Sequence, residues 1–146
     1  MTVAYIDIRF FAHATEDPER VLEAVQCLIP TECFEDIRLK KSTLKGHYGN
    51  PIILFEAKVR SKRVIEAVMR RISTGLDEYD KRELRRRFSA YVERGNLYLR
   101  LDKQAAYQGR IRLCPSDPIR LRIHFKRSRL EDVMKECQEL GILPPE

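Results

Sequence analysis

A two-residue alternation of apolar and basic side chains marks the segments 96–102, 110–114 and 118–126. Successive side chains of a β-strand point to opposite faces, so each segment has one apolar and one basic face. The positions predicted to point inward are all aliphatic or aromatic: Leu97, Leu99, Leu101, Ile111, Leu113, Ile119, Leu121, Ile123 and Phe125. This pattern predicts three strands of a sheet that packs one face on a core and turns the other to solvent.

The rest of the chain supplies helices for the buried face. Apolar stripes at helical spacing follow a capping residue at 15 or 17, at 61, at 77 and at 128, and Pro30, Gly75, Gly95 and Gly141 end the four predicted helices. Alternation predicts further strands over 3–13, 35–42 and 52–60. The expected order is β-α-β-β-α-α-β-β-β-α. It favours an α+β fold, a two-layer sandwich of a mostly antiparallel sheet with helices on one face.

The length of 146 residues fits one domain, so we expect residues 1–146 to form a single α+β unit. No uncharged stretch approaches the ~20 apolar residues that span a bilayer. The first residues lack a basic region ahead of an apolar run, so no signal peptide is expected. The four cysteines form no C-x-x-C pair and are interpreted as small buried hydrophobes in a reducing cytosol. A cytoplasmic protein is therefore expected.

The net charge of +6 is the remainder of an uneven distribution. Residues 1–36 carry two bases and eight acids, and residues 128–146 carry two bases and five acids. Residues 58–94 hold twelve bases and six acids, and residues 95–127 hold eight bases and two acids. A basic middle between acidic ends favours a surface that binds a polyanion.

Strand alternation places most bases of residues 95–127 on one face. The outward positions are Tyr98, Arg100, Arg110, Arg112, Arg120, Arg122, His124 and Lys126. Strands lie ~4.8 Å apart, so these guanidinium groups would crowd unless anions neutralise them. Arg forks onto phosphate and stacks on bases, and Tyr98 and Tyr107 could add stacking surface, which favours RNA. The alternative is a solvated face paired with acids elsewhere in the fold. The cluster also requires 110–114 to lie beside 118–126.

Two other basic groups are lesser signals. The run from Arg82 to Arg87 fans out around a helix and is expected to be a solvated face. A strand–helix junction carries Lys58, Arg60, Lys62 and Arg63, where N–H groups at the helix start could add to a phosphate contact.

Catalytic and cofactor motifs are not found in the sequence. His13, His47 and His124 have no ligand spacing to another His or Cys, so no metal is expected. The chain has no G-x-S-x-G, P-loop or G-x-G-x-x-G motif. His47 or His124 would be the general base of an RNA-cleaving site, yet no acid partner is implied by spacing. We expect no enzyme, no catalytic residue and no cofactor.

Three stretches resemble a known family: residues 11–17 (FAHATED) through 28–30 (LIP), residues 46–53 (GHYGNPII), and above all residues 96–113 (NLYLRLDKQAAYQGRIRL). Together they resemble the archaeal RNA-binding proteins described as predicted exosome subunits. The resemblance implies an archaeal cytoplasmic protein with a fold like that of the large-subunit ribosomal protein that binds 5S ribosomal RNA. It supplies no catalytic residues.

Within the matching block 101–109 (LDKQAAYQG) and its flanks, the predicted RNA contacts are Arg100, Lys103, Gln104, Tyr107 and Arg110. The alternative is that Asp102 and Gln104 only satisfy backbone groups of the loop. With the outward strand residues, the predicted RNA-binding set is Tyr98, Arg100, Lys103, Gln104, Tyr107, Arg110, Arg112, Arg120, Arg122 and Lys126.

The prediction is a non-catalytic RNA-binding protein that uses the Arg-rich outer sheet face, with limited choice of sequence. An exosome or ribosomal partner goes with the resemblance. The alternative is a protein–protein adaptor that docks a basic partner through acidic helices at 16–29 and 129–140.

Overall fold

The computed structural model describes residues 2–46 and 49–145, with side chains except at 18 and 34–36. His47, one of the candidate bases, lies outside the described residues. The elements in order are β1 (Val3–Ala12), α1 (Pro18–Gln26), the 3-10 helix η1 (Thr31–Asp36), β2 (Leu39–Lys45), β3 (Pro51–Val59), α2 (Lys62–Gly75), α3 (Glu78–Arg86), α4 (Phe88–Tyr91), β4 (Val92–Glu93), β5 (Asn96–Asp102), α5 (Lys103–Tyr107), β6 (Pro118–Phe125) and α6 (Leu130–Glu139).

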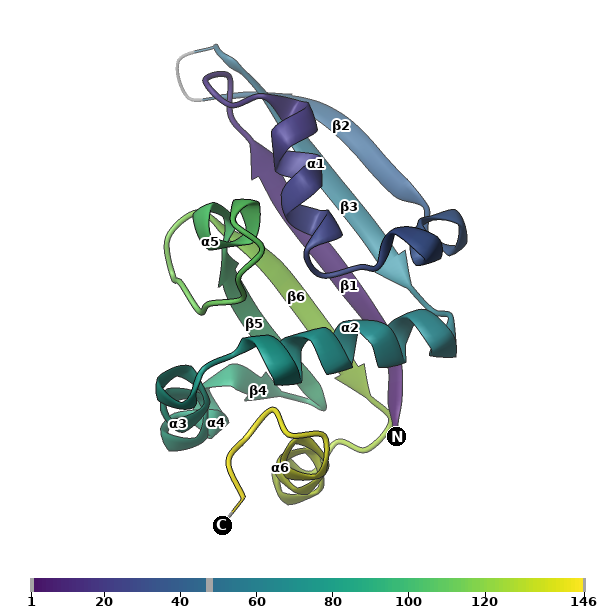
Figure 1. Cartoon of the computed structure of the whole chain (residues 1–146), viewed down its shortest axis with the longest axis vertical. Helices are drawn as coiled ribbons and strands as arrows, with labels where there is room; N and C mark the ends of the chain where they lie inside the picture. The colour runs from purple at the N-terminus through teal and green to yellow at the C-terminus, as the bar shows by residue number, and fades with distance from the viewer. Residues whose placement is uncertain (1, 47–48, 146) are drawn as a thin grey trace.

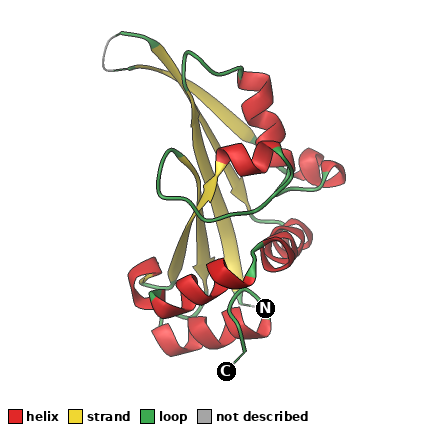
Figure 2. Cartoon of the chain, turned by 60° about the vertical axis from the view of Figure 1, so that its left-hand side comes forward, coloured by secondary structure: helices red, strands yellow, loops and turns green. Residues whose placement is uncertain are grey.

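The strands form one six-stranded antiparallel sheet in the order β2-β3-β1-β6-β5-β4 (Figure 1). β1 is central and pairs with both β3 and β6, so the amino-terminal strand separates two hairpin-like halves. The helices lie on one side of the sheet and around its lower end (Figure 2). The predicted α+β sandwich is confirmed. We call the sheet side opposite the helices the outer face.

Helical stripes and strand alternation meet in one apolar core. Asp17 caps α1 by accepting the Glu19 N–H at 3.0 Å, with Pro18 in the first turn, as the sequence predicts. The buried stripe of α2 consists of the predicted residues Val64, Ile65, Val68, Met69 and Ile72. These pack in the same cluster as the inward residues of β5 and β6, among them Leu99 and Leu121. Burial of this apolar surface is the main stabilising contribution to the sheet–helix contact.

The predicted strand at 110–114 is wrong. In this segment the structure has only an isolated bridge, Leu101 to Leu113, supported by Asp102 N–H to Arg112 C=O at 2.8 Å. The segment lies against β5 on the side away from β6, because β6 pairs directly with β5. The Gly109 turn, with φ +75°, and a Pro on either side of Asp117 leave too short a run for a ladder.

The predicted helix over 77–95 is interrupted. Its continuation is α4 and then β4, which pairs with β5 through Val92 and Leu97. Arg94 and Gly95 between them have φ +52° and +79°, the left-handed pair that closes a two-residue hairpin. Pairing at the sheet edge therefore outweighs helical periodicity there. The predicted strand at 35–42 is likewise displaced to 39–45, where Leu39 is exposed instead of buried.

Two short features differ at the helix ends. Residues 103–107 form the short helix α5, whereas the sequence predicts a polar turn between two strands there. The final helix is capped at Arg129 without a side-chain hydrogen bond, so the predicted cap at Ser128 does not form.

Candidate nucleic-acid interface

The antiparallel register aligns basic residues of five strands in rows across the outer face. Arg9 of β1 faces Arg120 of β6, which faces Arg100 of β5. On the other side of β1, Arg9 faces Glu56 of β3, which faces Lys40 of β2. The next row runs from Lys58 through Asp7 and Arg122 to Tyr98. Alternation alone aims these side chains away from the helices.

These rows line a groove of about 720 Å³ on the outer face. Its lining includes the basic residues Arg9, Arg38, Lys40, Lys58, Arg100, Arg120 and Arg122, together with Tyr98 and the acids Asp7 and Glu56. The positive charges outnumber the negative ones by seven to two. We call this set the outer-face groove.

Two of the seven cations of the groove share one carboxylate, that of Asp7. Arg122 lies 3.1 Å from Asp7, and Lys58 lies 3.8 Å from the same carboxylate. Arg122 also donates to the Tyr5 hydroxyl at 2.8 Å. Burial lowers the pKa of Arg122, but the Asp7 charge and the Tyr5 hydroxyl outweigh it and raise that pKa. Arg122 therefore stays charged and is held in place by two partners.

The row formed by Arg9, Arg120 and Arg100 is not neutralised. Within the described part of the chain, the side chains of Arg9, Arg100 and Arg120 form no hydrogen bond or ion pair. Their Cα atoms are direct cross-strand partners, so three like charges stand at ~4.8 Å strand spacing. Like charges directly opposite one another destabilise a sheet. This row can therefore receive an anion without breaking an existing contact.

Lys103 and Tyr107, two of the predicted RNA contacts, lie elsewhere. The Lys103 side chain is only 3% exposed, and its ammonium contacts Glu16 at 3.0 Å and Asp117 at 2.8 Å. It also donates to the Phe11 carbonyl at 2.8 Å. Tyr107 donates to Glu16 at 3.2 Å. Both side chains are thus engaged in an internal network, and neither lines the outer-face groove.

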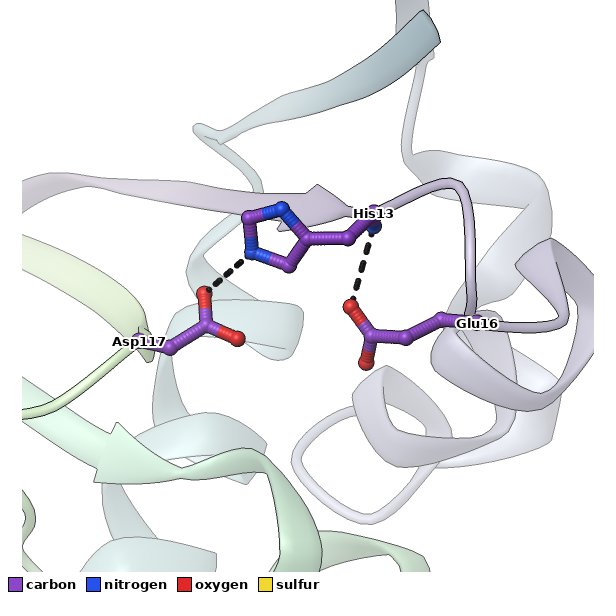
Figure 3. Close-up of side chains that lie close together, drawn as sticks. All are labelled: His13, Glu16 and Asp117. Carbon is purple, nitrogen blue, oxygen red and sulfur yellow. Dashed lines mark hydrogen bonds and ion pairs between the residues drawn. The ribbon is translucent and has the colours of Figure 1, made fainter. Parts of the chain in front are cut away.

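The same network brings together a set of groups typical of metal ligands. His13, Glu16 and Asp117 place their ligand atoms within 4.8 Å of one another (Figure 3). The His13 ring contacts Asp117 at 3.1 Å, and the His13 N–H donates to Glu16 at 3.0 Å. A cation already binds the two carboxylates, because the Lys103 ammonium contacts both. The sequence could not indicate this cluster, since Asp117 lies 104 positions from His13 along the chain.

The Lys103 ammonium helps to lower the pKa values of the Glu16 and Asp117 carboxyl groups. Burial raises the pKa of Glu16, but hydrogen bonds from His13 and Lys103 outweigh it and lower that pKa. Burial likewise raises the pKa of Asp117, while bonds from Lys103 and His13 bring it below its usual value. Burial beside the Glu16 carboxylate raises the pKa of Tyr107 to about 12. The network is therefore a hydrogen-bonded structural connection between the ends of β1, α5 and β6.

Arg110 and Arg112 are separated from the outer-face groove because 110–114 is not beside β6. They line a second groove, of about 480 Å³, where α2 ends and α3 begins. Arg110 donates to the Gln108 side chain at 2.6 Å. Asp80 accepts the Leu113 N–H at 3.0 Å, and burial raises the pKa of Asp80, although the charge of Arg112 opposes the increase. These two arginines thus share a mixed-charge surface.

Gln104 and Lys126 complete the predicted set. Asp102 caps α5 by accepting the Gln104 N–H at 2.9 Å, which is the backbone role that the sequence left open. The Gln104 side chain is exposed. Lys126 is exposed just beyond β6, with its N–H bonded to the Thr2 carbonyl at 2.7 Å. Neither side chain lines the outer-face groove.

The predicted set also omitted groove residues. Arg9, Lys40 and Lys58 line the groove from β1, β2 and β3, and Arg38 lines it from the residue just before β2. The alternation over 3–13 already put Arg9 on the face opposite the core. Arg9 lies beside Arg120 because β1 is placed between β3 and β6. Local periodicity does not specify this strand order.

Comparison with known proteins identifies the family of this chain. The chain belongs to the family whose model is described as RNA binding, which matches residues 5–125. It is 36% identical over 139 residues to RNA-binding protein PAB1135 of Pyrococcus abyssi, covering 92% of this chain and 90% of that protein. It is also 32% identical over 146 residues to uncharacterized protein MJ0213 of Methanocaldococcus jannaschii, covering 93% and 97% of the two chains.

Solved structures show the same fold. The crystal structure of protein AF2318 from Archaeoglobus fulgidus, a DUF54 protein, is 29% identical with a TM-score of 0.77, and covers 94% of this chain and 99% of that one. Mth689 from Methanothermobacter thermautotrophicus, another DUF54 protein, is 26% identical with a TM-score of 0.77, over 94% and 97% of the chains. Among the described residues, no helix is both long and apolar enough to cross a membrane.

Proposed function

We propose that this protein binds RNA without catalysis and that the outer-face groove holds the phosphates. The observation that carries the proposal is the row Arg9–Arg120–Arg100, aligned on three adjacent strands with no acidic partner among the described residues. Membership of the RNA-binding family supports the ligand class. The groove is the proposed phosphate-binding surface because its lining holds seven basic side chains and two acidic ones.

Arginine is suited to this role. Its guanidinium presents a planar fork to phosphate oxygens and releases condensed counterions when it binds. Phosphate contacts position RNA without reading its sequence, so we expect limited sequence choice. Arg122 and Lys58, both paired with Asp7, border the unpaired row. Arg110, Arg112, Lys103 and Tyr107 fall outside the proposed surface.

A salt titration tests the proposal. The variant with Arg9, Arg100 and Arg120 changed to Ala removes three phosphate contacts. The slope of log affinity against log salt for a labelled single-stranded RNA should flatten by about 2, because each contact contributes about 0.7. The matched control changes Arg70, Arg82 and Arg87, exposed arginines of the helical segments, to Ala. An unchanged slope in the first variant, or equal loss in the control, would refute the groove as the binding surface.

The absence of catalysis is tested separately. Labelled RNA incubated with the protein and divalent metal should stay intact. Cleavage that disappears in His124→Ala would show an RNA-cleaving site on the outer face, since the His124 ring is bonded there to Asn96 at 2.8 Å.

The adaptor alternative loses part of its acidic surface in the structure. Glu16 is engaged by Lys103, and Glu136 accepts hydrogen bonds from the Thr2 N–H and hydroxyl. Exposed acids remain on both helices, namely Glu19, Glu23, Glu131 and Glu139. An exosome or ribosomal protein partner is proposed on the sequence resemblance alone. Co-purification from native extract, with and without RNase, distinguishes a direct protein partner from one bridged by RNA.

A further inference from the structure

Among the described residues, Tyr5 and Tyr98 stand on the outer face, and of these two only Tyr98 has a ring without a stacking or cation contact. Tyr5 stacks on His124 of β6, with ring centroids 4.8 Å apart and an interplanar angle of 21°. The Lys58 ammonium of β3 lies 4.5 Å from the same ring centroid. β1 runs between β3 and β6, so these groups flank the Tyr5 ring from either side. No base can stack there without displacing them.

Tyr98 is the contrasting case. It is 40% exposed on β5 and lines the outer-face groove. Within the described part of the chain its ring stacks on no other ring and lies under no cation, and its hydroxyl has no hydrogen bond. A ligand could therefore contact this ring without displacing any described side chain. It is a surface on which a planar group can be placed.

The cations around Tyr98 have the arrangement that a nucleotide chain needs. Arg122 of β6 is the direct cross-strand partner of Tyr98, and Arg100 lies two residues further along the same face of β5. From Arg100 the unpaired row continues over Arg120 to Arg9 and crosses the strands. An aromatic ring thus lies at one end of a line of phosphate-binding groups.

We propose that the ligand is a single-stranded RNA segment that crosses the strands, with one base stacked on Tyr98 and its backbone phosphates on Arg100, Arg120 and Arg9. This inference rests on the proposed function, since it names the RNA class that the same groove takes. In a duplex the base faces are covered by neighbouring pairs, whereas unstacked bases of single strands stack on aromatic side chains. Single strands and duplexes both present phosphates, so the Tyr98 ring is the group that distinguishes a single strand from a duplex.

Substitutions at Tyr98 test this by fluorescence anisotropy with three probes: a single-stranded RNA, the same length of RNA duplex, and a single strand with abasic sites. Tyr98→Leu removes the ring and should weaken single-strand binding by about 5- to 100-fold, the value of one stacked base. Tyr98→Phe keeps the ring and should bind like the wild type. The salt slope should be unchanged in both, because no phosphate contact is lost.

The other probes separate the possible failures. Tyr98→Leu should leave the affinity for the abasic strand and for the duplex unchanged. Equal loss for all three probes, or no loss for the single strand, would overturn the stacking inference. Suppose that Tyr98→Leu gives one of these results but the variant lacking Arg9, Arg100 and Arg120 shows the flattened salt slope. The stacking inference is then wrong, and the proposed phosphate surface stands. Thermal unfolding of each Tyr98 variant checks the fold, which should persist because the side chain is exposed.

Discussion

Asp7 occupies two cations of the outer-face groove, so its removal predicts a gain of binding. Its carboxylate lies 3.1 Å from Arg122 and 3.8 Å from Lys58. In Asp7→Asn the amide has a similar shape but no charge, and both cations become available to phosphate. Two added contacts should steepen the salt slope for single-stranded RNA by about 1.4. Between about 50 and about 200 mM salt the variant should therefore lose about 7-fold more affinity than the wild type.

The assay is anisotropy across that salt range, with Glu66→Gln as the control. Glu66 is exposed on α2, so its substitution raises the net charge equally without touching the groove. Stability should change by about 1 kcal/mol or less, because the Asp7 pairs are partly exposed and such pairs contribute little. An unchanged slope in Asp7→Asn, or the same change in Glu66→Gln, would show that Arg122 and Lys58 do not contact phosphate.

Three further results are expected. Lys103→Met leaves the carboxylates of Glu16 and Asp117 facing each other without a cation and should cost about 3 kcal/mol of unfolding free energy in urea; a loss below about 1 kcal/mol would contradict the structural role. The pKa values of the Glu16 and Asp117 carboxyl groups are lowered from 4.5 and 3.8, so the stability they contribute is present above those values and should be lost as the pH falls below them. Urea titrations at decreasing pH should show this decline, and it should be weaker in Lys103→Met. Arg120→Thr relieves two like-charge cross-strand pairs, and calorimetry at low salt should show stability raised by about 1 kcal/mol while RNA affinity falls; lower stability would contradict the assigned register.

The sequence predicted the layers well because they depend on local periodicity. Alternation identified the two faces of β1, β5 and β6, and the stripe from Val64 to Ile72 identified the buried side of α2. The errors are at 77–95 and 110–114, where local pattern competes with pairing to a neighbour. Residues 92–93 join β5 at the sheet edge, and 110–114 has the alternation of a strand but gains only one bridge.

The candidate site was predictable in part for a related reason. Tyr98, Arg100, Arg120 and Arg122 come from neighbouring strands of one hairpin-like pair, so alternation places them on one face. Arg9 requires knowledge of strand order, which depends on long-range pairing. The burial of Lys103 was not predictable, because its partners Glu16 and Asp117 lie 87 and 14 positions away along the chain. A lysine in a polar block has the same local appearance whether exposed or buried.

The treatment of charge differs between the two places where like charges meet. At the α5 network, two carboxylates approach each other and the fold supplies Lys103 between them. On the outer face, Arg9, Arg120 and Arg100 stand side by side, and no described side chain neutralises them. Glu56 is the cross-strand neighbour of Arg9, yet it forms no ion pair with it within the described residues. Unrelieved repulsion lowers stability, and natural proteins accept such losses where binding needs the strained group. The α5 network therefore belongs to the architecture, and the unpaired row is where an anionic ligand would stabilise the folded protein most.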